Sequence, residues 1–334
     1  MRLTGSESAV TCTAPVEIAG NPAPPGAEYG WLERPGGVRL RYGLWKKPPD
    51  QPNTARGTVV VIPGRTEFIE KYFEVVGELL SRGYGVAVLD IRGQGLSTRL
   101  LSNRTKGHVA CFLDYSHDLN SWINEVVTAR LPAPYRLLTH SMGGAIALAY
   151  LHDNPGVIER AAMIAPMVKL KAVPIPYPLA AFFVKMAKSV FGPEAATASG
   201  PRSDPTLMPF ERNVVTHDAG RFDREQALLA ACPDLVVGAP TLGWMSQAVA
   251  IAAKLADPAY VQAIKIPILV FCAEEDRLIN NQAEVELAAR LPAGKLVTIA
   301  GAHHEILMET DARREAFWRA FDAFMAEEKA GAGA

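Results

Sequence analysis

The sequence has few cysteines, and they are not spaced for metal binding or redox chemistry. Cys12, Cys111, Cys232 and Cys272 lie far apart and form no C-x-x-C pair or zinc-like cluster. This spacing is typical of reduced, mostly buried thiols in a cytoplasmic protein. We therefore expect no metal site and no cofactor.

The chain also lacks an excess of charge of either sign. Its 34 Lys and Arg residues and 35 Asp and Glu residues leave a formal net charge of -1. A chain without a basic excess gives no electrostatic reason to expect nucleic acid. Residues 1–7 lack the apolar core of a signal peptide, and no apolar run reaches membrane-spanning length. We expect a soluble cytoplasmic protein with no nucleic-acid partner.

Nucleotide-binding loops are missing as well. Residues 92–97 read RGQGLS and resemble a phosphate loop only superficially. They lack the spacing of G-x-G-x-x-G, and no Walker lysine follows them. We interpret them as a tight loop near the functional site.

What the chain does contain is a regular alternation of apolar runs and helical patterns. Of its 334 residues, 49% are hydrophobic, which suits one large domain with an insertion. Continuous apolar runs are typical of buried parallel strands, and the alternation predicts an α/β fold with a doubly wound, mostly parallel sheet. Residues 38–42 alternate in polarity and predict an antiparallel edge strand. The predicted parallel strands are residues 58–62, 85–89, 136–139, 161–164, 266–272 and 295–299, and the helices are residues 70–81, 115–129, 145–152, 282–289 and 312–328.

Two regions interrupt this alternation. Residues 1–30 are rich in Pro, Ala and Gly and predict a poorly ordered or surface-draped arm. No strand fits between the predicted core segments, residues 31–166 and 265–330. Residues 167–264, here named the cap segment, therefore predict a mostly helical cap. It would lie over the strand ends, where open α/β sheets bind ligands.

One short segment is typical of a nucleophile elbow. Residues 137–144 read LLTHSMGG, an apolar strand that runs into a serine followed by two glycines. A serine hydroxyl must stand clear of the sheet on a sharp turn before a base can take its proton, and Gly143 and Gly144 leave room for that turn. Ser141 is thus a candidate nucleophile, although a structural serine at a buried turn has a similar pattern.

Nucleophilic catalysis on this architecture also needs an acid and a histidine, in that order after the serine. Glu274, Glu275 and Asp276 all follow the predicted strand 266–272. Asp276 is favoured because apolar residues after it can anchor its turn. His303 and His304 follow the last strand, and from their placement alone either can be the base.

An oxyanion hole would complete such a site with two backbone N–H groups. One is expected from Met142, directly after the nucleophile, and the other from Arg65, in the loop after an early strand. The Arg65 side chain could meet an anionic head group or form a salt bridge with Glu67 or Glu70.

Residues 63–67 (PGRTE), 90–97 (DIRGQGLS) and 140–144 (HSMGG), with Asp276 and with His304 before a glutamate, resemble the α/β-hydrolase superfamily. The likeness is closest to its bacterial lysophospholipase and monoacylglycerol lipase group and covers residue 37 onward. It implies an α/β-hydrolase fold, a triad of Ser141, Asp276 and His304, and backbone donors at Arg65 and Met142.

Two residues depart from the family pattern. Thr139 stands in place of the first elbow glycine, and Pro63 stands in place of the histidine usual in the monoacylglycerol lipase loop. The second departure favours the lysophospholipase-like branch, and neither removes a reacting group.

The function implied is a cofactor-free serine hydrolase of carboxylic esters, with a lysophospholipid or monoacylglycerol as substrate. Hydrolysis of non-lipid esters, amides or peptides is the alternative, because a triad does not specify the leaving group. A non-catalytic binding protein is a third reading. Residues 179–188 are apolar with two lysines and fit either a lid in transient, peripheral contact with a membrane or a core-facing cap helix.

Overall fold

An eight-stranded sheet forms the centre of the protein. The computed structural model describes residues 15–47, 56–173, 175–197 and 208–327 of the chain. The strand order is β1-β2-β4-β3-β5-β6-β7-β8; β2 pairs antiparallel with β1 and β4, and the remaining pairs are parallel. The predicted α/β class with a mostly parallel sheet is confirmed. The strands are β1 (Ala27–Arg34), β2 (Val38–Trp45), β3 (Thr58–Ile62), β4 (Gly85–Leu89), β5 (Tyr135–His140), β6 (Ile158–Ile164), β7 (Ile268–Ala273) and β8 (Gly294–Ile299).

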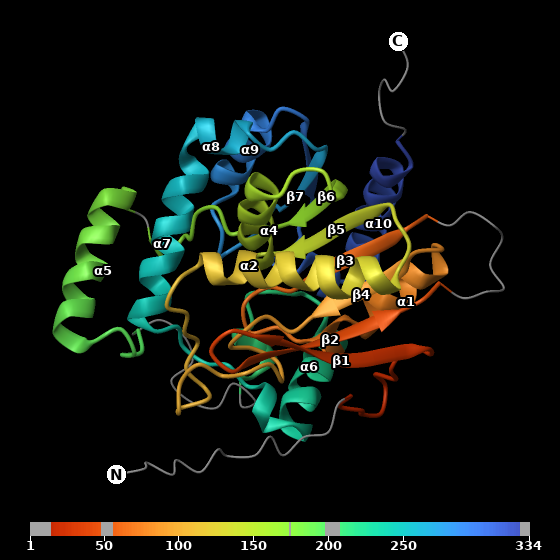
Figure 1. Cartoon of the computed structure of the whole chain (residues 1–334), viewed down its shortest axis with the longest axis horizontal. Coiled ribbons are helices and arrows are strands. Elements are labelled where there is room, and N and C mark those ends of the chain that lie inside the picture. The colour runs from red at the N-terminus through yellow and green to blue at the C-terminus, as the bar shows by residue number, and fades with distance from the viewer. Residues whose placement is uncertain (1–14, 48–55, 174, 198–207, 328–334) are drawn as a thin grey trace.

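Helices cover both faces of the sheet (Figure 1). Side chains of α1 and α10 pack on one face, and those of α2, α4, α8 and α9 pack on the other. Because alternate strand residues point to opposite faces, Val60 joins one core cluster and Val59 and Val61 join the other. The α-helices are α1 (Phe73–Ser81), α2 (Leu113–Trp122), α3 (Thr128–Arg130), α4 (Met142–Asp153), α5 (Tyr177–Phe191), α6 (Ala219–Ala231), α7 (Leu242–Ala256), α8 (Pro258–Gln262), α9 (Asn281–Arg290) and α10 (Asp311–Ala326). Shorter helical turns are η1 (Ile69–Tyr72), η2 (Ile123–Val127), η4 (Phe210–Arg212), η5 (Pro233–Leu235) and η6 (Ile306–Met308).

The N-terminal side of the sheet differs from the prediction. β1 occupies the edge and begins inside the predicted arm, so the edge position expected for residues 38–42 is wrong. Most β1 side chains are exposed or half-buried, and such a strand carries no apolar run. Before it, Val16 N–H donates to Glu70 at 3.1 Å and Asn21 donates to the Glu70 carbonyl at 3.0 Å. The first fourteen residues of the predicted arm lie outside the described residues.

Helices make up the described part of the cap segment, which leaves the sheet after β6 and returns before β7. No strand occurs in that described part, only isolated bridges such as Ala196↔Thr241. Helix α5 packs against α7 at one end of the molecule (Figure 1). Residue 174 and residues 198–207 of this segment lie outside the described residues.

The cysteines do not all behave as predicted. Cys111 and Cys272 are free, but Cys232 is disulfide-bonded, so the expectation of reduced thiols is wrong at that position. Cys12 lies outside the described residues. The cysteines therefore do not support a cytoplasmic location. Among the helices of the described residues, none is long and apolar enough to cross a membrane.

Candidate active site

Ser141 lies at the turn between β5 and α4, at the carboxyl edge of the sheet. Its backbone has φ 50° and ψ -115°, in a region that non-glycine residues rarely occupy. A Cβ on Gly143 would overlap the Ile62 carbonyl oxygen, and one on Gly144 would come within 2.7 Å of Pro166. Glycine is therefore required at both positions for α4 to start this close to the neighbouring strands.

A continuous hydrogen-bonded chain links Ser141, His304 and Asp276. His304 Nε2 lies 2.9 Å from Ser141 Oγ, and His304 Nδ1 lies 2.6 Å from Asp276 Oδ2. The three residues follow β5, β8 and β7, whose carboxyl ends share one edge of the sheet. Asp276 and His304 are 2% and 3% exposed, so both are shielded from water.

Asp276 is held in its ionised form by hydrogen bonds. Its Oδ1 accepts from the backbone N–H groups of Leu278 and Ile279, at 2.7 and 2.9 Å. Burial raises the pKa of Asp276, but the hydrogen bond from His304 and those from the backbone outweigh burial and lower the pKa overall. An ionised carboxylate here can orient His304 and stabilise its protonated form.

The two neighbouring acids make different contacts. Glu274 Oε2 accepts from Gly301 N–H at 2.7 Å, on the loop after β8. Glu275 is mostly exposed, and its Oε2 lies 3.5 Å from His303 Nε2. Of the three acids left open by the sequence, only Asp276 contacts His304 within the described residues.

The two adjacent histidines, His303 and His304, also make different contacts. The His304 ring reaches Ser141, whereas the His303 ring packs against the His217 ring at a tilt of 34°, with 3.7 Å between ring centroids. Successive side chains on an extended segment point in opposite directions, so only one of the pair can face the serine.

In the loop after β3, the residues on both sides of Arg65 have hydrogen-bonded backbone N–H groups. Gly64 N–H donates to the Glu67 carboxylate, and Thr66 N–H donates to Gln94 Oε1 at 2.9 Å. Within the described chain, the Arg65 N–H itself has no acceptor. Met142 is the first residue of α4, so its N–H has no partner within the helix. Two unpaired donors are thus available where the sequence predicted them.

The Arg65 side chain does not form either predicted salt bridge. Its guanidinium donates to the Gly238 carbonyl and lies over the Trp244 ring, with Cζ 5.4 Å from the ring centroid. Burial lowers the pKa of Arg65 to about 10. The side chain instead joins the loop after β3 to the cap segment.

Glu67 and His140 support the site, and the sequence analysis missed both roles. Glu67 Oε2 accepts from Tyr72 Oη at 2.6 Å and lies 3.1 Å from His140 Nδ1. His140 Nε2 lies 3.3 Å from the His304 carbonyl oxygen. Burial lowers the pKa of His140, but Glu67 outweighs burial and raises it overall. His140 thereby fixes the backbone that carries His304.

Lys71 connects the same network to the cap segment. Its ammonium lies 3.3 Å from Glu67, 3.0 Å from Glu225 on α6 and 2.8 Å from Glu305. Glu67 and Lys71 are four residues apart in the sequence, and this spacing is the one local signal that could have found the pair. Their partners come from distant segments and leave no local pattern.

Known proteins resemble this chain over most of its length. A family model described as serine aminopeptidase, S33, matches residues 53–311. Lysophospholipase L2 of Escherichia coli (strain K12) is 36% identical over 269 residues, covering 77% of this chain and 76% of that protein. Probable lysophospholipase L2 of Haemophilus influenzae is 27% identical over 276 residues, covering 82% and 86%.

Solved structures agree on the fold. A soluble variant of monoglyceride lipase from Saccharomyces cerevisiae superimposes with a TM-score of 0.66 at 19% identity, covering 90% of this chain and 95% of that one. The resemblance to the α/β-hydrolases and to their lysophospholipase and monoacylglycerol lipase group is confirmed. The match over residues 53–311 and the sheet with its flanking helices show that the chain belongs to the serine aminopeptidase S33 family of α/β-hydrolases.

Proposed function

We propose that the protein is a serine hydrolase that cleaves the carboxylic ester of a lysophospholipid, with monoacylglycerols as related substrates. The observation that carries this proposal is the hydrogen-bonded chain from Asp276 through His304 to Ser141, at 2.6 and 2.9 Å. Such a chain is what activation of a serine hydroxyl requires, and it uses protein groups alone.

In the proposed reaction Ser141 Oγ attacks the ester carbonyl carbon while His304 Nε2 takes the hydroxyl proton. The protonated imidazole is stabilised by Asp276 and then returns the proton to the leaving alcohol. Water next attacks the acyl group, with His304 again as base, and releases the fatty acid and free Ser141.

The negative charge on the carbonyl oxygen would be stabilised by the N–H groups of Arg65 and Met142. Met142 lies at the N-terminus of α4, where the helix dipole also favours negative charge. Because the flanking amides of the Arg65 loop are already bonded, this donor is in place before substrate binds.

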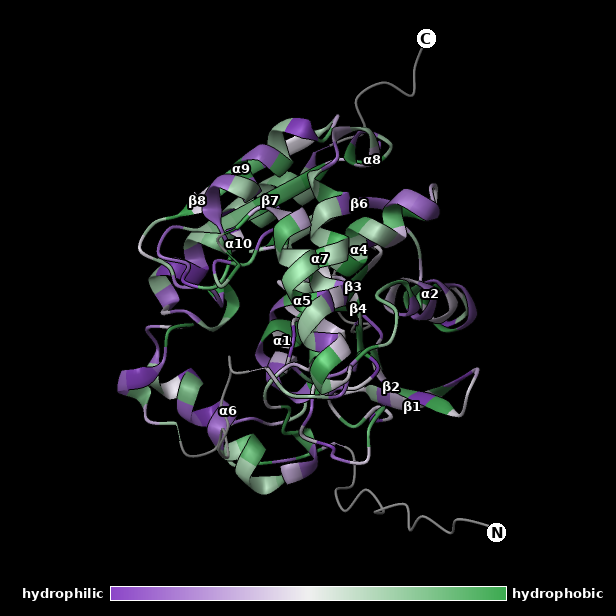
Figure 2. Cartoon of the chain, turned by 90° about the vertical axis from the view of Figure 1, so that its left-hand side faces the viewer, coloured by the Kyte–Doolittle hydropathy of each residue, from purple (hydrophilic) through white to green (hydrophobic). Residues whose placement is uncertain are grey.

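Lipid as the substrate class is supported by the names of the relatives and by the surface of α5. Escherichia coli lysophospholipase L2 is the more similar of the two relatives described above. Helix α5 exposes a set of large apolar side chains and carries two lysines, and it faces the viewer in Figure 2. The exposed apolar residues on α5 are Leu179, Phe182, Phe183, Met186, Val190 and Phe191. We propose that residues 167–264 act as a cap and that α5 makes peripheral contact with a membrane surface.

The family description favours one alternative, hydrolysis of an amide or peptide bond. A substrate panel separates the two: a lysophospholipid, a monoacylglycerol with the same acyl chain, a short p-nitrophenyl ester and an aminoacyl p-nitroanilide. We expect the highest kcat/KM on the lysophospholipid and no turnover by Ser141→Ala. A preference for the anilide would replace the lipid assignment with a peptidase. Turnover that survives in Ser141→Ala would reject the serine mechanism.

A further inference from the structure

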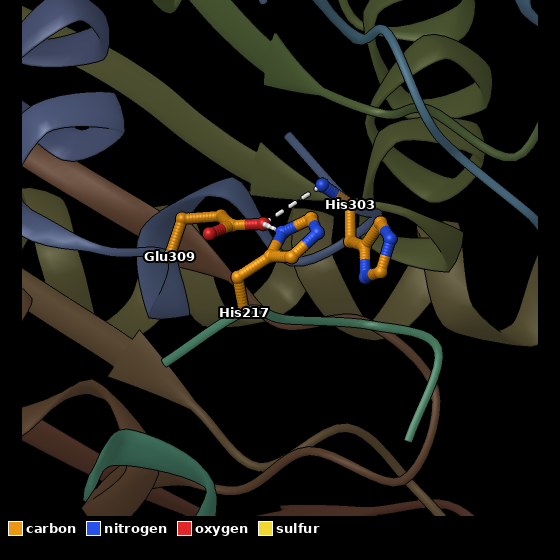
Figure 3. A group of neighbouring side chains, drawn as sticks. All are labelled: His217, His303 and Glu309. Atoms are coloured by element: carbon orange, nitrogen blue, oxygen red, sulfur yellow. Dashed lines mark hydrogen bonds and ion pairs between the residues drawn. The ribbon is translucent and has the colours of Figure 1, made fainter. Parts of the chain in front are cut away.

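A cluster of metal-ligating side chains lies next to the triad residues but takes no part in the proposed reaction. It consists of His217, His303 and Glu309, shown in Figure 3. His217 belongs to the cap segment and precedes α6, whereas the other two lie between β8 and α10. Each residue offers one ligand atom, and these atoms lie within 4.8 Å of one another. Two segments that are far apart in sequence, the cap segment and the connection from β8 to α10, thus meet at one point.

Glu309 holds the two histidines together. Its Oε1 lies 2.7 Å from His217 Nδ1 and accepts from the His303 backbone N–H at 2.8 Å. The Glu309 side chain is fully buried. A buried carboxylate therefore contacts the ring of His217 and the backbone of His303.

His303 has a ring nitrogen that no protein group satisfies. The residue is 7% exposed, and its Nδ1 is buried without a hydrogen-bond partner among the described residues. Leaving a buried polar atom unpaired costs about 1–3 kcal/mol, so such an atom calls for an explanation. A bound cation would supply the missing partner, because a neutral imidazole nitrogen is a good metal ligand.

A second carboxylate, Glu275, lies on the solvent side of the cluster. Glu275 Oε2 lies 3.5 Å from His303 Nε2 and 3.8 Å from His217 Nε2. Glu275 is half-exposed, so this side is open to an ion from solution. Glu275 therefore lies at the Nε2 edges of the two rings, whereas Glu309 contacts the His217 ring at Nδ1.

We propose that His217, His303 and Glu309 bind one divalent transition-metal ion of the Zn²⁺ type, with Glu275 beside the ring nitrogens that do not bind the ion. Imidazole and carboxylate together suit Zn²⁺, Co²⁺ or Ni²⁺ better than Ca²⁺ or Mg²⁺, which prefer oxygen ligands alone. Zn–N and Zn–O bonds of about 2.1 Å put tetrahedral ligand atoms roughly 3.4 Å apart. The ligand atoms of His217, His303 and Glu309 lie within 4.8 Å of one another, so small side-chain rotations bring them to this separation.

The ion would connect parts of the molecule that matter for catalysis. His303 immediately precedes His304, and Glu275 immediately precedes Asp276, while His217 comes from the cap segment. Bound metal would thus fix the cap segment to the loop that carries His304, with Glu275 beside the site on the loop that carries Asp276, and it would not contact Ser141. Its effect is on stability and loop position, and no reaction step passes through it.

Isothermal titration of the tag-free full chain with ZnCl₂ tests this proposal. The background is Cys111→Ser, since an exposed thiol also binds zinc. We expect one Zn²⁺ per chain with a Kd below about 10 µM, and a Tm increase of roughly 5 °C when free metal is in about 100-fold excess over Kd. His303→Asn and His217→Gln should each weaken binding by at least about tenfold.

His152→Gln is the matched control, because His152 also pairs with a carboxylate, Asp153 at 2.6 Å, but has no second imidazole beside it. It should bind Zn²⁺ as the parent does. Glu275→Gln is a second probe, since a half-exposed side chain can be changed without disturbing the core, and we expect it to weaken binding about threefold or more. Parent protein that binds no Zn²⁺ at 100 µM, or binding that is equal in the parent and both histidine variants, would overturn the proposal.

Discussion

Two regions of this protein reverse the usual distribution of polar and apolar residues, in opposite directions. At the carboxyl edge of the sheet, charged and polar side chains such as Glu67, Asp276 and His304 are almost fully buried. On α5, large apolar side chains are exposed, with Val190 and Phe191 at 72% and 71%. Buried polar groups and exposed apolar groups are the informative exceptions in a folded protein.

The difference between the regions lies in where their partners are. Asp276 and His304 are satisfied by neighbours within the chain, and Glu67 accepts hydrogen bonds from three other residues. Burial is tolerable because those bonds replace water. Within the described residues, the outer face of α5 has no such neighbours. Under the function proposed above, its partner is a lipid surface outside the molecule.

The largest loss of activity is expected when the buried polar site loses its nucleophile or its base. Ser141→Ala and His304→Ala should each reduce kcat on the order of 10⁴-fold or more, because the groups act as one unit. The double variant should be little worse than either single variant. Steady-state hydrolysis of a p-nitrophenyl ester measures this, and unchanged circular dichroism would show that the fold survives.

His303→Ala provides the control within the same loop. We expect it to lose about tenfold or less, through altered loop packing alone. An inactive His303→Ala alongside an active His304→Ala would mean that the other histidine of the pair is the base.

A change at Asp276 is expected to give the next largest loss of activity. Asp276→Asn should lower kcat on the order of 10³-fold, because an amide favours the wrong His304 tautomer while preserving shape. Glu274→Gln is the matched change two residues away and should stay within about threefold of the parent enzyme. Similar losses in both variants, measured on the same ester, would contradict the assignment of Asp276.

Glu284 on α9 sharpens the comparison because it is a buried carboxyl without the partners that Asp276 has. Burial raises the pKa of Glu284 to about 8 and outweighs the Cys272 thiol, which lies beside its carboxyl group and lowers the pKa. The unfolded pKa is near 4.5, so the stability contributed by the neutral form is complete below that pH and is lost as pH rises through about 8.

Glu284→Gln should therefore flatten the pH dependence of stability. Between pH 5 and pH 9 we expect the parent protein to lose about 4 kcal/mol more of unfolding free energy than the variant, since one pKa unit corresponds to about 1.4 kcal/mol. Urea unfolding at both pH values measures the difference. Parallel losses in the two proteins would show that Glu284 is ionised at neutral pH.

The smallest effect is expected on α5. Phe182→Ser/Phe191→Ser should weaken binding to vesicles of anionic phospholipid by about tenfold, because apolar area is removed from the contact. Hydrolysis of a soluble short-chain ester should not change. Val285→Ser on α9 is the matched control, an exposed apolar residue on another helix. Vesicle binding that falls equally in both variants would reject α5 as the contact surface.

Most of the core could be predicted because its strands are buried on both faces. β3 and β4 are buried at every position, and the sequence of such a strand is a continuous apolar run. β1 could not be predicted in this way, since an edge strand with one solvated face has no such run. The disulfide at Cys232 also left no sign in the spacing of the cysteines.

Some residues of the candidate site could likewise be predicted from the sequence, and others could not. The turn at Ser141 is a local pattern, and Asp276 and His304 were selected with the help of a family resemblance. His303 and His304 could not be distinguished from their placement, because the choice depends on which way each side chain points. Lys71 bonds to Glu225 and Glu305, which are 154 and 234 residues away, and no local sequence signal encodes contacts over that distance.

The pairing of β6 with β7 has a consequence for how such enzymes diversify. Ile164 and Phe271 are partners in the sheet, so the long segment between them leaves and re-enters at adjacent strands. Exchanging that segment for one of another length leaves the strand order and the hydrogen-bond register untouched. Under the function proposed above, substrate preference and the catalytic scaffold can then change independently, and a chimaera built at these two strands would keep Ser141 while acquiring a different substrate preference.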